Sequence, residues 1–396
     1  MNSGPKQELW TRHFIIICLV NLLCFLSFHM QMVVFPFFII HLGGDRVLAG
    51  LTAGLFSIAA LLFRPLAGWA LDNAGRRAPV FWGMAGMFVL TLVYARAYWL
   101  VVIVLLRIAH GIFWSFTSTG IITNASDHVP RARFAEGMGY FGITMTVSMA
   151  IAPALGLYIK NNFGFGALFF CSAGIALGAF AMTFIICFKP LPAQEKRPLA
   201  QIIGGLFEKT ALPASVTILF FLIPYGAVHT FIALYADESG IGSGGLYFAI
   251  IAISSIIVRI LGGQIADKIG ERPIIYLGVI SLILAMLLLV LIKTMPAFLL
   301  SSLVFGIGFG GMPPAMQAFA MRKARPEKRG AASSTYLCAF DIGIGLGGII
   351  SGFLVEYLGY TTMFATMIIP VICCLLIYVL WAGKSEAAFK KQAPGA

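Results

Sequence analysis

The sequence predicts an all-α membrane protein with twelve transmembrane helices arranged as two six-helix repeats. First, 60% of its residues are hydrophobic and 11% are charged, with a mean hydropathy of +0.95, whereas a soluble domain has about 45–50% apolar and about 25% charged residues. Second, one span takes about 20 apolar residues, so 396 residues accommodate about a dozen spans and no large extramembrane domain. Third, the two halves of the chain contain related segments. This composition excludes a soluble enzyme.

Each predicted helix is an apolar run that ends at charged residues or at a break rich in glycine or proline. The first run is too long for the core of a signal peptide and no small-residue cleavage site follows it, so we expect it to be retained. The seven cysteines lie inside apolar stretches without paired spacing, which predicts packing roles and neither disulfides nor a metal site. The helices are expected at residues 13–40, 49–71, 79–97, 99–123, 136–160, 166–188, 211–235, 244–266, 273–293, 297–320, 332–356 and 361–382.

The distribution of basic residues sets the predicted orientation. With the N-terminus placed inside, most of the 27 lysines and arginines fall in cytoplasmic segments, and the outer connections hold Arg46, Arg96, Lys160 and Lys293. Because basic loops stay on the cytoplasmic side, both termini are predicted to be cytoplasmic. The net charge of +12 is therefore a topology signal. Anionic lipid headgroups are the expected partner, and nucleic acid is not.

The longest connection between spans divides the chain into two predicted bundles of six helices. This connection, residues 189–210, is rich in proline, lysine and glutamate. It separates an N-terminal bundle at 1–188 from a C-terminal bundle at 211–382, and a cytoplasmic tail follows at 383–396. Because both bundles belong to one chain, we expect a monomer.

The two predicted bundles share an internal repeat. Residues 130–140 resemble residues 326–336, and at nearly the same offset residues 64–77 resemble residues 259–272. The second alignment pairs Arg64 with Arg259, Leu66 with Leu261, Gly68 with Gly263, Asp72 with Asp267, Gly75 with Gly270 and Arg77 with Arg272. Two matches at nearly one offset indicate a duplicated six-helix unit. Such duplication is typical of transporters, which bind substrate between the repeats near the bilayer midplane.

The loop between the second and third spans carries the most specific motif of the chain. Its residues Gly68, Asp72, Gly75, Arg76 and Arg77 resemble the signature loop of the major facilitator superfamily, and a weaker copy at 263–272 contains Asp267 and Arg272. The resemblance covers nearly the whole chain and implies the fold of that superfamily, with no cofactor. It also implies that the loop is a cytoplasmic latch. The alternative is a loop that only orders the turn between the helices.

Physical chemistry assigns separate tasks to the residues of this loop. Its glycines would permit a tight turn and close helix approach. Asp72 could pair with Arg76 or Arg77 through charge-assisted hydrogen bonds.

Two further motifs resemble those of the same superfamily. Arg107 and His110, followed by Gly111, resemble its second motif in the fourth span. In the fifth span the chain resembles the pattern of proton-driven antiporters at Gly139, Ser148, Ala152, Pro153 and Gly156. Ser148 and Ala152 stand where the family has glycines, and Leu157 replaces a second terminal glycine. The resemblance favours the bacterial drug or metabolite antiporter branch.

The repeat distinguishes polar residues that occur in both halves, and so belong to the scaffold, from polar residues that occur in one half only. Arg64 and Arg259 occupy equivalent places, so we expect them to be architectural and to extend their side chains to the interface. Asp341, by contrast, has Thr146 or Met145 at the equivalent place.

Arg107, which has Ser302 at the equivalent place, and Asp341 are also expected at roughly 12–14 Å depth, near the middle of the membrane core. Charged side chains at that depth indicate a functional site. Asp341 is the predicted proton carrier, and Arg107 is predicted to lie near it and to bind a substrate anion.

Other candidates lie on spans that line the cavity in this superfamily. Histidines can carry protons near neutral pH, and the candidates are His29, His110 and His229. Each histidine alone is equally well explained as a packed core residue. The first span carries no acid, unlike that of many drug exporters. The remaining predicted substrate-binding residues are polar or aromatic, and they are Asn21, Gln31, Trp114, Tyr225, Phe305 and Phe309.

These features predict a secondary transporter in a bacterial inner membrane that exports a small amphipathic or drug-like molecule in exchange for protons. A rival function is an importer or exchanger of a small organic anion, favoured by Arg107 and by the missing acid in the first span. An intramembrane enzyme or receptor is a third hypothesis, weakened because no HExxH or GxSxG constellation occurs. The chain also has no GxxxxGK[ST] loop, which argues against ATP hydrolysis.

Overall fold

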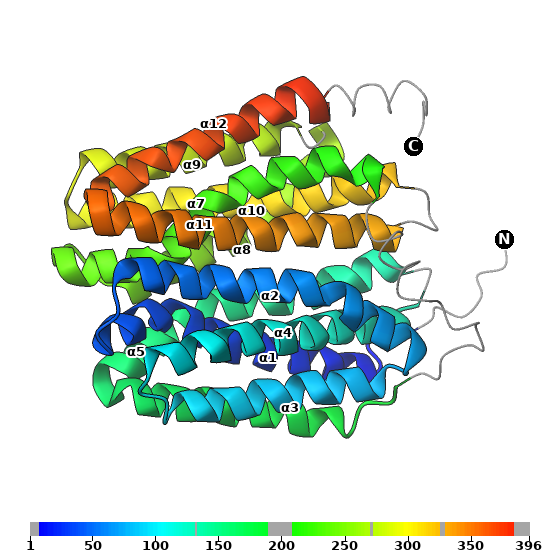
Figure 1. Ribbon diagram of the computed structural model, residues 1–396. Helices are drawn as coiled ribbons and strands as arrows, with labels where there is room; N and C mark the ends of the chain where they lie inside the picture. The colour runs from blue at the N-terminus through cyan, green and yellow to red at the C-terminus, as the bar shows by residue number, and fades with distance from the viewer. Residues whose placement is uncertain (1–7, 131–132, 189–207, 270–271, 325–328, 384–396) are drawn as a thin grey trace.

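The computed structural model describes residues 8–130, 133–188, 208–269, 272–324 and 329–383. These residues form helices with short connections, and no strand occurs among them (Figure 1). The N-terminal half contains α1 (Arg12–His41), α2 (Arg46–Asn73), α3 (Arg77–Tyr94), α4 (Leu100–His128) and α5 (Phe134–Thr183). The C-terminal half contains η2 (Lys209–Ala211), α7 (Leu212–Ser239), α8 (Gly244–Ile269), α9 (Arg272–Leu291), α10 (Met295–Lys323), α11 (Arg329–Thr366), α12 (Ile368–Ile377) and the π-helical turn η4 (Tyr378–Ala382).

Local sequence explains where several helices begin and end. The Thr11 hydroxyl accepts a hydrogen bond from the Phe14 backbone N–H, and the Asp45 carboxylate accepts one from the Leu48 N–H. Both are side-chain N-caps that satisfy donors of the first turn. At the end of α7 the backbone turns through Gly240 in the left-handed region, with φ 64°, which glycine adopts without a steric penalty.

Nine helices in the described part of the chain are long and apolar enough to cross a membrane. Two of these stretches, Gly137–Thr183 and Ala332–Ala382, contain 47 and 51 residues, about twice what one crossing requires. The first is broken at Gly164, with φ 82°, and the second at Gly359, with φ 78°. The two glycines are separated by the same offset that aligns residue 64 with residue 259, so the breaks follow the internal repeat.

The helices form two halves that lie one above the other in Figure 1. We call the side on which α1 begins and η4 ends the terminal side, and the opposite side the far side. At the boundary between the halves, α2 packs on α11, α5 on α8 and α1 on α7. Because the repeat relates α2 to α8 and α5 to α11, the first two contacts are equivalent to each other.

On the far side the halves approach so closely that α2 and α11 tolerate only glycine at several positions. A Cβ atom added to Gly50 would lie 2.4 Å from the carbonyl oxygen of Gly348, and one added to Gly352 would lie 2.7 Å from that of Arg46. Ion pairs add to this closure, because Arg46 contacts Glu238 of α7 at 3.0 Å and Glu356 of α11 at 3.5 Å. The sequence analysis missed this network, although opposite charges at helix ends on one predicted side were a visible signal.

Contacts between the halves extend inward from the far side. Hydrogen bonds, ion pairs and a ring contact join the halves from the far ends of the helices to the level of Arg64 and Arg259. The molecule is therefore closed on its far side.

Replacement of Gly50 by alanine should weaken this closure. The added methyl group collides with the α11 backbone, so the helices must separate at their far ends. Gly174→Ala is the matched control, because a Cβ at Gly174 meets nothing within 4 Å. We expect double electron–electron resonance between labels at the far ends of α2 and α11 to show a longer-distance population in Gly50→Ala only. An unchanged distance distribution in Gly50→Ala would show that the close contact does not hold this side shut.

Candidate functional site

The boundary between the halves contains one ion pair near the middle of the helices. Arg64 of α2 places its Nη2 and Nε atoms each 2.7 Å from Oδ2 of Asp341 on α11. Its Nη1 atom also lies 3.5 Å from the hydroxyl oxygen of Ser118 on α4. The two charged side chains are 11% and 18% exposed. A guanidinium that donates two hydrogen bonds to one carboxylate is among the stronger polar contacts in proteins.

This ion pair corrects two predictions. Arg64 was expected to extend to the membrane interface, but α2 continues to Asn73, so Arg64 lies about 13 Å inside the helix and turns to the nearest acid. Arg107 was expected beside Asp341, but the partner of Asp341 is Arg64. The first prediction failed because Arg64 lies more than two turns before the end of α2, and the second because sequence spacing does not determine which helices pack together.

The repeat-equivalent arginine also crosses the boundary. Arg259 of α8 donates a hydrogen bond through Nη1 to the hydroxyl oxygen of Thr146 on α5. Its expected extension to the membrane interface is therefore also wrong. Of the two candidate equivalents of Asp341, Thr146 is the one that takes its place against the arginine, and Met145 is not. The same contact is thus made by an acid in one half and by a neutral hydroxyl in the other.

Arg107 is buried within the N-terminal half, at 1% exposure. Its Nε atom donates to the carbonyl oxygen of Thr52 at 3.3 Å, and its Nη2 atom lies 3.1 Å from the sulfur of Met32. The guanidinium carbon lies 4.3 Å and 4.7 Å from the ring centroids of Phe35 and Phe56, within the range of cation–π attraction. None of these partners is an anion.

Two of the three candidate histidines face each other across the boundary. The rings of His29 on α1 and His229 on α7 are 5.8 Å apart. His29 is 7% exposed, and neither of its ring nitrogens has a hydrogen-bond partner among the described residues. His110 instead lies inside the N-terminal half, with its Nδ1 atom 3.4 Å from the Tyr94 hydroxyl. A buried unpaired imidazole is a polar group that a ligand or a proton could satisfy.

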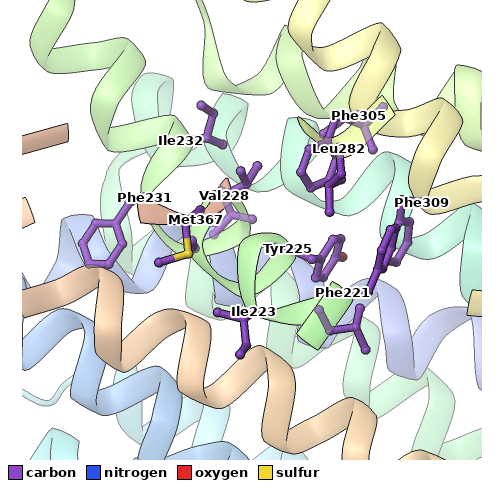
Figure 2. Packing of buried hydrophobic residues seen from close by; sticks show 14 of the residues in the cluster. Phe221, Ile223, Tyr225, Val228, Phe231, Ile232, Leu282, Phe305, Phe309 and Met367 are labelled. Carbon is purple, nitrogen blue, oxygen red and sulfur yellow. The ribbon is translucent and has the colours of Figure 1, made fainter. Parts of the chain in front are cut away.

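Each half contributes a stacked aromatic pair beside its histidine. In the N-terminal half Phe28 stacks on Trp114 with centroids 4.1 Å apart. In the C-terminal half Tyr225 stacks on Phe309 with centroids 4.2 Å apart, and Phe305 lies 6.2 Å from Tyr225, as Figure 2 shows. The structure therefore brings these predicted aromatic residues together within each half.

Two polar candidates on α1 bond within the N-terminal half. Asn21 donates to the Thr144 hydroxyl at 2.8 Å. Gln31 is fully buried and donates to Ser172 at 2.9 Å and to Thr91 at 3.3 Å. These contacts connect α1 with α3 and α5 and leave the amide nitrogens engaged within one half.

The loop between α2 and α3 is held by charges of the N-terminal half. Arg76 contacts Asp72 at 2.8 Å and Asp127 of α4 at 3.0 Å. Gly75 has φ 93°, which requires glycine. Gly68 was expected to permit the turn or a close approach, but it lies within α2 and a Cβ there would meet nothing within 4 Å.

The remaining members of the loop motif are only partly described. Arg77 begins α3 and its guanidinium carbon lies 5.1 Å from the ring centroid of Phe81. In the second copy, Arg272 donates to the Gly383 carbonyl oxygen at 3.2 Å. The side chain of Asp267 lies outside the described part of the chain.

The motif of the fifth span packs α5 against α1. Ser148 donates to the Leu22 carbonyl oxygen at 2.7 Å, and a Cβ at Gly156 would lie 2.5 Å from the carbonyl oxygen of Met30. Ala152 and Pro153 are buried between these positions, whereas Gly139 is exposed. Small residues are therefore needed along most of this contact.

Comparison with known proteins identifies relatives along almost the whole chain. The family model described as Major Facilitator Superfamily matches residues 17–348 and 292–396. An uncharacterized MFS-type transporter of Burkholderia pseudomallei is 24% identical over 381 residues, covering 94% of this chain and 90% of the relative. Among solved structures, the nucleoside transporter NupG matches with a TM-score of 0.74 at 15% identity, over 94% of this chain and 99% of its own. The human organic anion transporter MFSD10 matches with a TM-score of 0.71 at 16% identity, over 94% and 100% of the two chains.

A double-mutant cycle should measure the coupling between Arg64 and Asp341. Arg64→Gln and Asp341→Asn each leave a partly buried charge without its partner. The stability losses of the two single variants should therefore add up to more than the loss in the double variant. We expect a coupling of about 1–3 kcal/mol from reversible unfolding above neutral pH. The control cycle is Asp72→Asn with Arg76→Gln, whose acid is 59% exposed, and it should give at most about 1 kcal/mol. Equal coupling in the two cycles would mean that burial does not strengthen the central pair.

Proposed function

Because the chain belongs to the Major Facilitator Superfamily, we propose that it is a proton-coupled transporter in which Asp341 carries the proton and the Arg64–Asp341 pair locks the empty protein. The family match and the named transporters among its relatives and structural neighbours make the chain a multi-pass membrane transporter and not an enzyme. The proposed reaction is export of a small amphipathic or drug-like molecule in exchange for protons.

The proposed topology has twelve spans with both termini in the cytoplasm. The breaks at Gly164 and Gly359 support it, because each divides a double-length helix into two crossings. The bundles are residues 1–188 and 211–382, joined by the cytoplasmic loop 189–210, and the tail follows from residue 383. The terminal side is then cytoplasmic and the far side is external. Basic loops on the terminal side and bacterial relatives support a bacterial inner membrane.

The observation that carries the proposal is the ion pair across the boundary of the halves. Arg64 belongs to the N-terminal half and Asp341 to the C-terminal half, so their attraction exists only while α2 and α11 are close. Among the described side chains, the charged or titratable groups that act on Asp341 are Arg64 and Cys338, the latter on α11 itself. A proton on Asp341 removes the negative charge, and the neutral acid holds a guanidinium much less strongly.

In an exchanger, the protein must not change sides when it is empty, and this ion pair provides that restraint. With Asp341 charged and no ligand bound, the pair favours the arrangement that is closed on the far side. Either a proton on Asp341 or a substrate that engages one partner releases that preference. Release by a proton and release by a substrate alternate. This alternation produces exchange, because the empty protein is locked and does not change sides freely.

Two motifs support parts of this scheme. The small residues Ser148, Ala152 and Gly156 form the antiporter-like contact between α5 and α1. The Asp72–Arg76–Asp127 cluster stiffens the α2–α3 loop, and we assign this loop as the latch of the cytoplasmic side.

A second candidate function is import or exchange of a small organic anion. The specific observation in its favour is that two arginines, Arg107 and Arg259, have no carboxylate partner among the described side chains. A structural neighbour is an organic anion transporter, which is consistent with this candidate. Flux direction under an imposed pH gradient separates the two functions.

The proton role of Asp341 can be tested without a known substrate. In lipid nanodiscs, the distance between labels at the cytoplasmic ends of α2 and α11 should change between pH 5 and pH 8 in the wild-type protein, because protonation weakens the lock. Asp341→Asn keeps the shape and removes the titration, so its distances should be the same at both pH values. The control is Asp45→Asn, which retains the N-cap of α2 and should respond like wild type. A full pH response in Asp341→Asn would assign the proton to another group, such as His29.

A further inference from the structure

The repeat places two equivalent arginines at the boundary but gives only one of them an acid. Arg64 on α2 contacts Asp341 on α11, and Arg259 on α8 contacts Thr146 on α5. The helices of the second contact are the repeat equivalents of the first. Thr146, in the N-terminal half, is therefore the position that lacks the carboxylate that Asp341 provides in the C-terminal half.

Among the side chains that the structure describes, no carboxylate pairs with Arg259, which contacts Thr146. Its Nε atom is buried without a hydrogen-bond partner among the described residues. Thr146 offers only a hydroxyl oxygen, since the hydroxyl proton is donated to the Gly142 carbonyl at 3.1 Å. The phenol of Tyr336 on α11 is close enough to feel the charge of Arg259. That phenol donates its proton to the Pro313 carbonyl oxygen of α10 at 2.7 Å, so it is neutral and supplies no anion.

Arg259 lies at the boundary between the halves, where it contacts α5 of the N-terminal half. By the repeat it occupies the same level of the boundary as Arg64. Arg107, the other arginine without an acid, is enclosed by α1 and α2 within one half and has two aromatic rings beside it. The two arginines therefore differ in their surroundings, and only Arg259 contacts the opposite half.

The surroundings of Arg259 also suggest the rest of the ligand. Gly310, the neighbour of Phe309, packs so closely on Ser255 that a Cβ would lie 2.6 Å from the Ser255 carbonyl oxygen. Ser255 is one helical turn from Arg259 along α8, about 6 Å. Phe309 of the stacked pair with Tyr225 therefore lies on α10 at the level where that helix packs on α8, one turn from Arg259. An aromatic or apolar body at the rings could place an anionic group at Arg259.

We infer that Arg259 binds the anionic group of the substrate, and that the substrate is a small amphipathic anion with a carboxylate or phosphoryl group. The ligand supplies the negative charge that Asp341 supplies in the other half, and Thr146 leaves room for it. This inference rests on the proposed transport function and specifies its substrate class. The proton site and the anion site are then equivalent places of the two repeats.

The experiment uses matched pairs of probes on the purified full-length protein in nanodiscs. Benzoate is compared with benzamide, and phenyl phosphate with phenol, by the shift of the melting temperature, because a ligand of the folded state raises it. We expect the anion of at least one pair to raise the melting temperature by about 2–4 °C and its neutral counterpart to have no effect. If neither anion stabilises the wild-type protein, the inference is wrong for the class it names.

Variants locate the anion site. Arg259→Gln should abolish the anion-dependent shift. Thr146→Asp should abolish it as well, because the new acid occupies the guanidinium, and should itself raise the melting temperature above that of Thr146→Asn. The last comparison shows that the variant is folded. Arg96→Gln, which removes an exposed arginine on the far side, is the charge control and should keep the full shift.

The inference is also overturned by an anion-dependent shift that is retained in Arg259→Gln, and loss of that shift in Arg107→Gln would then move the anion to Arg107. The pH-dependent distance change of α2 and α11 is measured on the same variants. The pH-dependent distance change could be lost in Asp341→Asn alone, while the anion-dependent shift of the melting temperature is the same with and without Arg259. In that case this inference fails and the proposed proton coupling stands.

Discussion

A charge buried within a membrane protein needs a partner, and here that constraint joins the two halves of the chain. Arg64 is largely buried, and the acid that pairs with it belongs to the other half. Removal of one partner from such a pair costs several kcal/mol. The pair therefore couples the separation of the halves to whatever can replace the lost attraction, which for a transporter is a proton or a substrate.

Close packing on the far side gives this single pair its importance. Glycines of α2 and α11 bring backbone onto backbone, and Arg46 spans the gap to two acids of the other half. These contacts close one side without any group in the membrane interior that titrates. Farther along the boundary, Arg64 and Arg259 each contact the opposite half. Small energetic changes at that level act on the whole boundary, because each half moves as a packed unit.

The sequence predicted long apolar helices, which the structure contains, because helices depend on local composition and on periodic spacing, whereas the count of twelve spans and the depth of Asp341 stay predictions. It did not predict the partner of Asp341, since a contact between residues 64 and 341 depends on which faces of distant helices meet. The occurrence of Arg64 in both repeats led to a wrong prediction of where its side chain lies. Both repeated arginines cross the boundary, and the difference between them lies in the residue they meet. The same limit applies to Arg107, whose burial was expected but whose contacts with Phe35 and Phe56 require the packed bundle.

The central claim is that Asp341 exchanges a proton and that this exchange weakens its contact with Arg64 across the boundary of the halves. Infrared difference spectroscopy of the lipid-reconstituted protein between low and high pH measures this directly, because a protonated carboxyl group has its own C=O stretching band. The account predicts a carboxyl band in the wild-type difference spectrum that disappears in Asp341→Asn, with the amide bands of both proteins otherwise alike. A carboxyl band of unchanged intensity in Asp341→Asn would contradict the assignment of Asp341 as the proton carrier.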